Sequence, residues 1–342
     1  MDQSTSYKFS FFALIILLIL TFFFNISLGS VSIPLKEIFA SIFGNTSNNE
    51  TWEYIIIDFR IPKSITAILA GSGLSISGLL MQTLFRNPLA GPFVLGISSG
   101  ASLGVAILIL GASILGGGFI LLGHNQIAIA IAASLGSFLV LTFVMLLAKR
   151  VKNTMAILII GLMFGSFTAA IISVLAYFSS AENLQQYLFW SFGSLGNLSW
   201  NEILIFFIIY LIGIILVIPN IKSLNSLLLG ENYAKSLGMN LQKSRNSILL
   251  TTSILTGVIT AFSGPIAFIG LAVPHITKLV FNTSNHKILI PAVAIFGAII
   301  MLISDTIAQL PNSEFVLPIN AITSLFGAPV VIWLLMRKQK LS

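Results

Sequence analysis

The chain has 342 residues, of which 56% are hydrophobic and 8% are charged, and its formal net charge is +7. Soluble domains carry about 25% charged residues, so this composition excludes a soluble globular fold and indicates a polytopic membrane protein. No cysteine is present, which excludes disulfides, thiolate metal sites and a lipobox anchor. The basic residues stand at the ends of apolar runs, so membrane orientation explains them better than nucleic-acid binding does.

Apolar runs long enough to cross a bilayer follow one another along the chain. A span needs about 20 mostly apolar residues, and about ten such runs lie between polar breaks. The first run lacks a small-x-small cleavage site, so we expect a retained span rather than a signal peptide. Ser263-Gly264-Pro265 divides another region, for which we expect a hairpin of two spans. The expected spans are Phe9–Leu28, Ile61–Leu84, Val94–Leu110, Ile127–Ala148, Met155–Phe178, Ile203–Pro219, Ile248–Phe262, Ile266–Phe281, Ile288–Ile307 and Pro318–Met336.

The charges at the ends of these spans predict their orientation. Cytoplasmic loops are enriched in Lys and Arg, and an even number of spans puts most cations on one side only if both termini are cytoplasmic. That side would hold Lys8, Arg86, Lys149, Arg150, Lys152, Lys222, Lys235, Lys243, Arg245, Lys287, Arg337, Lys338 and Lys340, with Lys278 near it. The outer side would hold Lys36, Arg60 and Lys63 with the acids Glu37, Glu50, Glu53, Asp58, Glu182 and Glu314.

Polar segments connect the spans, and none of them suggests a second domain. Two outer loops, Ser30–Phe59 and Ser179–Trp200, and one inner loop, Asn220–Asn246, are the most extended. We expect the inner loop to form one or two short helices punctuated by Gly230 and Gly238. Because no internal repeat or linker is visible, residues 1–342 are expected to form a single transmembrane domain.

Catalytic and cofactor motifs are missing from the sequence. It contains no GxxxxGK[ST] loop for a nucleotide and no HExxH, and its histidines (His124, His275 and His286) are far apart. No pair of carboxylates falls inside one span. The sequence therefore predicts neither an enzyme nor a bound cofactor or metal.

Asp305, in the ninth expected span, is the clearest ionisable residue inside the membrane region. Such residues mark function by default, so one interpretation is a proton or cation site in a secondary transporter, with help from His275. The other is an acid near the outer end that is paired or hydrated. Because no neighbouring span offers a second acid, we favour the paired acid, and His275 after Pro274 is expected to be a packing residue.

Small residues mark two of the expected spans. In the second span, Ala67, Gly71 and Ser75 repeat every four residues, as do Ala70, Leu74 and Gly78, which favours close helix packing. The fifth span combines small residues and hydroxyls, which suit either packing or the lining of a wide pathway. Its candidate lining residues are Gly161, Gly165, Ser166, Ala169 and Ser173, with Ala170 beside them.

Two segments are candidates for contacts with other proteins. Arg60 and Lys63 lie on the outer side, where they either pair with Asp58 or Glu53, which spacing favours, or receive an acidic partner. The inner loop carries an apolar patch outside the expected spans, where contact with the bilayer core does not account for it. We therefore expect this loop to dock into a groove of a soluble partner, with a membrane-surface helix as the alternative. Its candidate residues are Leu227, Leu228, Leu229, Gly230, Ala234, Leu237 and Gly238.

Several motifs in one order resemble the iron–siderophore, haem and cobalamin permease family (FecCD type). They are Arg60-Ile-Pro-Lys63, the small-residue run ending at Gln82, FRNPLAGP at 85–92, LGISSGA at 95–101, the Leu229–Gly238 segment, SGPIAFIGLAVPH at 263–275 and GAPVVIWLL at 327–335.

The resemblance implies a type II ABC importer permease with ten transmembrane helices in the cytoplasmic membrane, working as a homodimer or with a close paralogue. ATP and Mg would reside on two separate ATP-binding subunits, and an extracytoplasmic binding protein would deliver an iron chelate, with ferric siderophore favoured over haem or cobalamin. It also implies that Leu227–Met239 couples to the ATPase, that Arg60 and Lys63 receive acidic groups of the binding protein, and that the fifth span with parts of the tenth lines the pathway.

Three departures from the family pattern concern the outer side. Family members usually carry Arg where Gln309 stands, so docking is expected to depend more on Arg60 and Lys63. Val316 stands where an acid is usual, with Glu314 displaced, and Asn320 replaces a glycine. These departures put the outer gate geometry in doubt, while leaving the resemblance intact.

Overall fold

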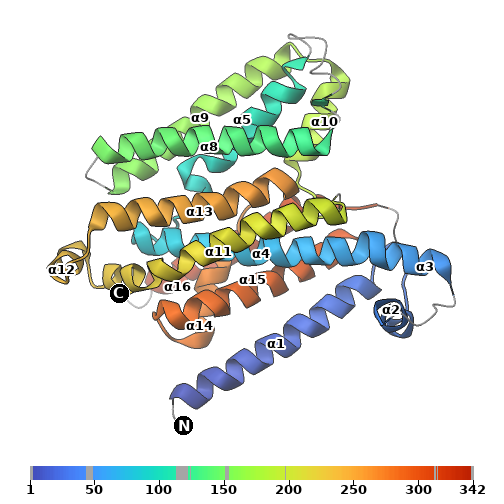
Figure 1. Cartoon of the computed structure of the whole chain (residues 1–342), viewed down its shortest axis with the longest axis horizontal. Coiled ribbons are helices and arrows are strands. Elements are labelled where there is room, and N and C mark those ends of the chain that lie inside the picture. Colours follow the sequence, from blue (N-terminus) through green and yellow to red (C-terminus); the bar gives the residue numbers. More distant parts are fainter. Residues whose placement is uncertain are drawn as a thin grey trace. The chain divides into compact units, whose positions relative to one another are not determined.

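The computed structural model describes residues 3–43, 49–112, 122–123, 125–150, 154–196, 198–311, 313 and 315–339, and within these ranges every regular element is a helix (Figure 1). Glu314, His124, Lys152 and Lys340 therefore lie outside the described residues. The helices are α1 (Gln3–Ser27), α2 (Leu35–Ile42), α3 (Glu50–Ile55), the π-helix η1 (Ile56–Arg60), α4 (Ile61–Leu84), the 3-10 helix η2 (Pro92–Leu95), α5 (Ile97–Ile109), α8 (Gln126–Arg150), α9 (Thr154–Tyr177), α10 (Ala181–Ser191), α11 (Trp200–Leu228), α12 (Glu231–Ser236), α13 (Leu241–Ser263), α14 (Ile269–Phe281), α15 (His286–Ala308) and α16 (Ile319–Gln339).

Every expected span coincides with an apolar helix. Seven helical segments are long and apolar enough to cross a membrane, and α5, α14 and α16 are shorter apolar helices, all counted over the described ranges. The expected division of the region at Ser263-Gly264-Pro265 is confirmed, because α13 ends at Ser263 and α14 begins at Ile269, while the hairpin of two spans stays a prediction. The expected end of the sixth span at Pro219 is wrong: α11 continues through this proline to Leu228. A proline is tolerated inside a membrane helix because neighbouring groups satisfy the freed backbone.

The contacts divide the chain into two compact units, each built from separate stretches of sequence. The first unit comprises residues 1–76, 194–207 and 267–342, and in it α1 packs against α15. Glycines allow the closest approach there: a Cβ on Gly71 of α4 would lie 2.3 Å from the carbonyl oxygen of Gly297. Because Ala67 and Ser75 are also fully buried, the small-residue face of the second expected span is confirmed as a packing surface.

The second unit comprises residues 77–193 and 208–266. Its tightest contact joins α5 to α8, where a Cβ on Gly104 would lie 2.0 Å from the carbonyl oxygen of Ala132. Ala101, Val105 and Ala133 are fully buried in the cluster beside this contact. Helix α10 lies in the outer loop Ser179–Trp200 and packs Trp190 against the same cluster.

Candidate functional site

A cavity of about 620 Å³ opens in the first unit, at the end of the molecule that the charge pattern places outside. It is bordered by the loop after α1, by η1, by the start of α4 and by the end of α15. Its lining includes both outer cations of the sequence analysis and residues of two family departures: Gly29, Ser30, Val31, Ile55, Phe59, Arg60, Lys63, Ser194, Gly196, Gln309, Ser313 and Val316.

The π-helix η1 determines where Arg60 points. An α-helix that takes in an extra residue to form a π-turn changes the direction of the side chains that follow, and such turns are frequent at functional sites. Arg60 is 9% exposed, and its Nη1 donates to the carbonyl oxygens of Ile26 at 2.5 Å and Ser27 at 3.0 Å. Its Nη2 donates to the carbonyl oxygen of Val31. The guanidinium therefore fastens the loop after α1, which the sequence did not predict.

Lys63 forms an ion pair with Asp305, whose Oδ1 lies 3.1 Å from the lysine Nζ. The lysine side chain is 19% exposed and that of Asp305 is 3% exposed. The lysine stem runs past Gly196, where a Cβ would lie 3.4 Å from Lys63 Cδ. Over the described part of the chain, neither Asp58 nor Glu53 pairs with Arg60 or Lys63, so the local pair favoured by spacing is wrong.

Besides its ion pair with Lys63, Asp305 accepts hydrogen bonds from two amide side chains. Its Oδ2 accepts from Asn25 Nδ2 at 3.0 Å and from Gln309 Nε2 at 2.7 Å. Asn25 in turn accepts from Ser64 Oγ at 2.6 Å, so the carboxylate belongs to a buried network that joins α1, α4 and α15. The paired-acid interpretation of Asp305 is confirmed. Asn25 was missed by the sequence analysis, although an amide side chain at the end of an apolar first span indicates a hydrogen-bond partner on a neighbouring helix.

Gln309 faces the cavity from the opposite side of Gly29. A Cβ on Gly29 would lie 2.9 Å from Arg60 Nη2 and 3.1 Å from Gln309 Oε1. The glycine thus lets the loop pass between these two side chains. Gln309 brings a neutral donor to Asp305, so Lys63 is the carboxylate's cationic partner in the structure.

On the inner side, helix α12 lies between Gly230 and Gly238, as expected. Both glycines have positive φ, +107° and +82°, which only glycine adopts without strain. Arg245 fixes the start of the helix, because its Nη2 lies 3.7 Å from Glu231 Oε1 and its side chain is 7% exposed. A Cβ on Gly230 would lie 3.8 Å from Arg86 Nη1, so the FRNP turn at 85–88 lies beside the start of α12.

The candidate coupling residues divide into two groups. Leu227 and Ala234 are buried at 5% and 0% exposure, so they hold the segment to the protein and offer no surface to a partner. The expectation of a docking surface is corrected for these two side chains. Leu229 and Leu237 are exposed at 63% and 59%, and Tyr233, which the sequence analysis missed, is exposed at 53%. Leu228, at 41%, adds to this apolar patch.

The fifth expected span, α9, divides in a similar way. Gly161 is buried, and a Cβ there would lie 2.1 Å from the carbonyl oxygen of Val94. It is therefore a packing residue, which corrects its assignment to a pathway. Gly165 is half-buried with Ser99 Oγ 3.3 Å from its Cβ position. Ser166, Ala169 and Ser173 are exposed along one face, and for them pathway lining stays a prediction.

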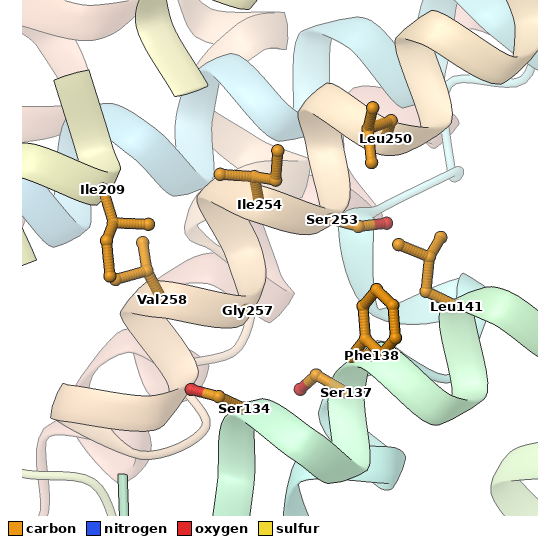
Figure 2. Close-up of a pocket in the computed structure, with 10 residues that line it drawn as sticks. All are labelled: Ser134, Ser137, Phe138, Leu141, Ile209, Leu250, Ser253, Ile254, Gly257 and Val258. Carbon is orange, nitrogen blue, oxygen red and sulfur yellow. The ribbon is translucent and has the colours of Figure 1, made fainter. Parts of the chain in front are cut away.

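A second cavity, of about 360 Å³, lies in the second unit between α8, α13 and Ile209 of α11 (Figure 2). No charged side chain lines it, and apolar residues such as Phe138 and Val258 form most of its wall. The hydroxyls of Ser137 and Ser253 donate to the carbonyl oxygens of Ile97 at 3.2 Å and Leu249 at 2.7 Å. This cavity therefore offers few polar groups to orient a ligand.

Asn320, the last family departure, has a structural role. Its Oδ1 accepts from the backbone N–H of Ala267 at 3.0 Å, in the loop between α13 and α14. Phe268, the next residue, has a φ of +66° and packs against Gly327 of α16. The asparagine thus fastens a strained loop to the start of α16.

Comparisons with known proteins agree over nearly the whole chain. A model of the FecCD transport family matches residues 17–337. The hemin transport system permease protein HmuU of Yersinia pestis is 34% identical over 328 residues, which are 96% of this chain and 95% of that protein. The vitamin B12 import system permease protein BtuC of Salmonella typhi is 34% identical over 292 residues, which are 84% of this chain and 85% of that protein.

The fold also has a close match among solved structures. An ABC transporter described as of the metal-chelate type, in an inward-facing conformation, gives a TM-score of 0.83 at 28% sequence identity. The match covers 95% of this chain and 98% of that chain.

Proposed function

Because the chain belongs to the FecCD transport family of ABC permeases, we propose that it forms the membrane path of an importer for a metal chelate. Ferric siderophore is the first candidate, with haem and cobalamin as alternatives. The observation that carries the proposal is the match of 95% of the chain to a transporter of the metal-chelate type at a TM-score of 0.83. HmuU and BtuC, whose names state hemin and vitamin B12, support the two alternatives. The chain is a multi-pass protein of the cytoplasmic membrane.

Energy for transport enters through α12. The sequence has no nucleotide-binding loop, so ATP is hydrolysed on separate ATP-binding subunits. Leu229, Tyr233 and Leu237 form an exposed apolar patch on the cytoplasmic side, which suits docking of the segment into a groove of such a subunit. Arg245, bound to Glu231, passes movement of α12 on to α13, and this tilts the helices around the pathway.

Substrate enters from the outer side, delivered by an extracytoplasmic binding protein. The outer cavity presents Lys63 at its wall, with Arg60 behind it, and a cation in such a cavity favours the carboxylates of an acidic partner. Arg60 is committed to three carbonyl oxygens, so its charge acts through space while Lys63 makes the direct contact. A second copy of the chain, or a close paralogue, completes the pathway along the exposed face of α9.

A secondary transporter driven by protons through Asp305 is the alternative of another class. Its support is weak, because Asp305 already has a lysine and two amide donors at hydrogen-bonding distance. An Asp305→Asn variant that retains ATP-dependent uptake counts against this alternative, whereas loss of all uptake with normal folding supports it.

Competition for uptake tests the substrate. The permease, its ATP-binding subunits and its binding protein are reconstituted in proteoliposomes, and uptake of a labelled ferric siderophore is measured with unlabelled haem or cobalamin as competitor. We expect ATP-dependent uptake of the siderophore that neither competitor reduces. If haem or cobalamin is taken up instead, the importer class stands and the siderophore assignment is rejected.

A further inference from the structure

We propose that Asp305 sets the affinity of the outer cavity for its acidic partner, because it holds Lys63 in an ion pair and offsets the cavity's positive charge. The inference rests on the proposed docking of a binding protein and concerns the regulation of that docking. It concerns a residue that none of the family motifs includes.

The charge balance of the cavity depends on Asp305. Arg60 and Lys63 are the charged side chains among the described lining residues, and Asp305 lies directly behind Lys63. The two cations and the carboxylate leave one net positive charge. Because Gln309 is neutral, it donates to Asp305 without adding a further cation to the cavity.

The geometry allows Lys63 to serve two partners in turn. Its side chain is 19% exposed, whereas the Asp305 side chain is 3% exposed, so the lysine lies between the buried carboxylate and the cavity. If Lys63 turns toward an incoming carboxylate, Asp305 keeps hydrogen bonds from Asn25 at 3.0 Å and Gln309 at 2.7 Å. Amide donors of this kind stabilise an ionised carboxylate. The lysine can therefore be shared while the acid keeps these two hydrogen bonds.

Competition by an internal carboxylate weakens docking, and this makes release of the binding protein faster. A like charge about 6 Å from a docked carboxylate, screened by a dielectric between those of protein interior and water, changes affinity by about tenfold. Asp305 thereby limits how long the partner stays bound, since affinity differences of this kind act mostly on the dissociation rate.

Binding of a defined acidic peptide tests the inference. The permease is placed in nanodiscs of uncharged phosphatidylcholine, and the probes are a labelled peptide of alternating Gly and Glu and its twin with Gln in place of Glu. Cytoplasmic cations bind the acidic peptide equally in every variant, so differences between variants report the outer cavity. The variants are Asp305→Asn, Lys63→Gln, the double variant of both, and Gln309→Arg.

The charge balance predicts an order of affinities. Asp305→Asn and Gln309→Arg each leave two net positive charges, so both bind the acidic peptide about tenfold more tightly than the unmodified permease at low salt. Lys63→Gln leaves none and binds more weakly, and the double variant returns to about the original affinity. The gains shrink as salt is added, and the Gln peptide shows no difference.

Two outcomes overturn the inference. If Asp305→Asn does not tighten binding while Lys63→Gln weakens it, docking at Lys63 stands and the role of Asp305 is rejected. If Lys63→Gln also leaves binding unchanged, the docking role itself fails and the inference fails with it. The double variant keeps the test decisive if Asp305→Asn proves unstable, because it binds more tightly than Lys63→Gln only if the charge of Asp305 opposes docking.

Discussion

Lys63 near the start of α4 and Asp305 near the end of α15 form an ion pair with 3.1 Å between Nζ and Oδ1. The pair lies in a network that also includes Asn25 of α1, so it joins three helices of the first unit at their outer end. The same contact that holds these helices together determines how much positive charge the outer cavity presents. Stability and docking are therefore linked through one pair of side chains.

Removal of one partner of this pair is expected to destabilise the protein. Lys63→Gln leaves a buried carboxylate without its cation, and we expect the free energy of unfolding to fall by about 3 kcal/mol. The double variant Lys63→Gln/Asp305→Asn removes both charges and is expected to recover most of this loss. Thermal unfolding in detergent measures both, and a double variant no more stable than Lys63→Gln contradicts the pairing.

The contact between α4 and α15 predicts that Gly71 does not accept a methyl group. A Cβ at this position would lie 2.3 Å from the carbonyl oxygen of Gly297 and 2.6 Å from Met301 Cβ, and backbone cannot move aside. We expect Gly71→Ala to cost about 1–3 kcal/mol of stability.

Gly257 in α13 is the matched control for Gly71. The nearest atom to its Cβ position is Ser137 Cβ at 3.8 Å, an ordinary contact. Gly257→Ala is expected to stabilise the protein by about 0.5–1 kcal/mol through helix propensity. Equal effects of the two substitutions on thermal unfolding would mean that the close helix contact is not as the structure has it.

The exposed apolar patch of α12 and its flanking residues predicts a variant that folds but does not associate with the ATP-binding subunit. Leu237 is 59% exposed, so Leu237→Ser is expected to change the free energy of unfolding by less than about 0.5 kcal/mol. Its burial in a partner groove would contribute about 2 kcal/mol, so association with the ATP-binding subunit should weaken by about tenfold or more. Ala234 is fully buried, and Ala234→Leu is the contrasting variant that should lower stability first. Normal association of the Leu237→Ser variant would reject α12 as the coupling surface.

The backbone conformation at Gly238 limits which residues can replace it, although there is space for a side chain. Its φ is +82°, and nothing lies within 4 Å of its Cβ position, so strain in Gly238→Ala comes from the backbone alone. Gly238→Pro cannot adopt this conformation and is expected to uncouple ATP hydrolysis from transport. Gly238→Asn should retain more coupling, because Asn tolerates positive φ better than other residues do. The number of ATP molecules hydrolysed per substrate imported distinguishes these variants, and normal coupling in Gly238→Pro contradicts the assignment.

The sequence predicted the helices well, because hydrocarbon thickness fixes the length of a span and apolar runs of that length can be recognised directly in the sequence. Its errors concern contacts that only the fold creates. Spacing favoured Asp58 as a partner for the outer cations, yet Lys63 pairs with Asp305, far away in the chain. Gly161 and the exposed Ser166 are both small residues of α9, and only the position of η2 against Gly161 distinguishes packing from exposure.

The π-helix η1 is a further feature that residue types did not reveal. Ile56–Arg60 reads Ile-Ile-Asp-Phe-Arg, a mixture of apolar and charged residues that carries no mark of a π-turn. Arg60 was expected to meet a partner, whereas the structure directs it to the carbonyl oxygens of Ile26 and Ser27. The docking expectation for Lys63 is compatible with the outer cavity, and it stays a prediction.

The energy source of transport tests the central claim most directly. Proteoliposomes that contain the permease and its ATP-binding subunits are loaded with ATP, and uptake of the ferric chelate delivered by the binding protein is measured with and without an imposed proton gradient. We expect uptake that requires ATP and the binding protein and does not change with the gradient. Uptake that follows the proton gradient and proceeds without ATP would contradict the account.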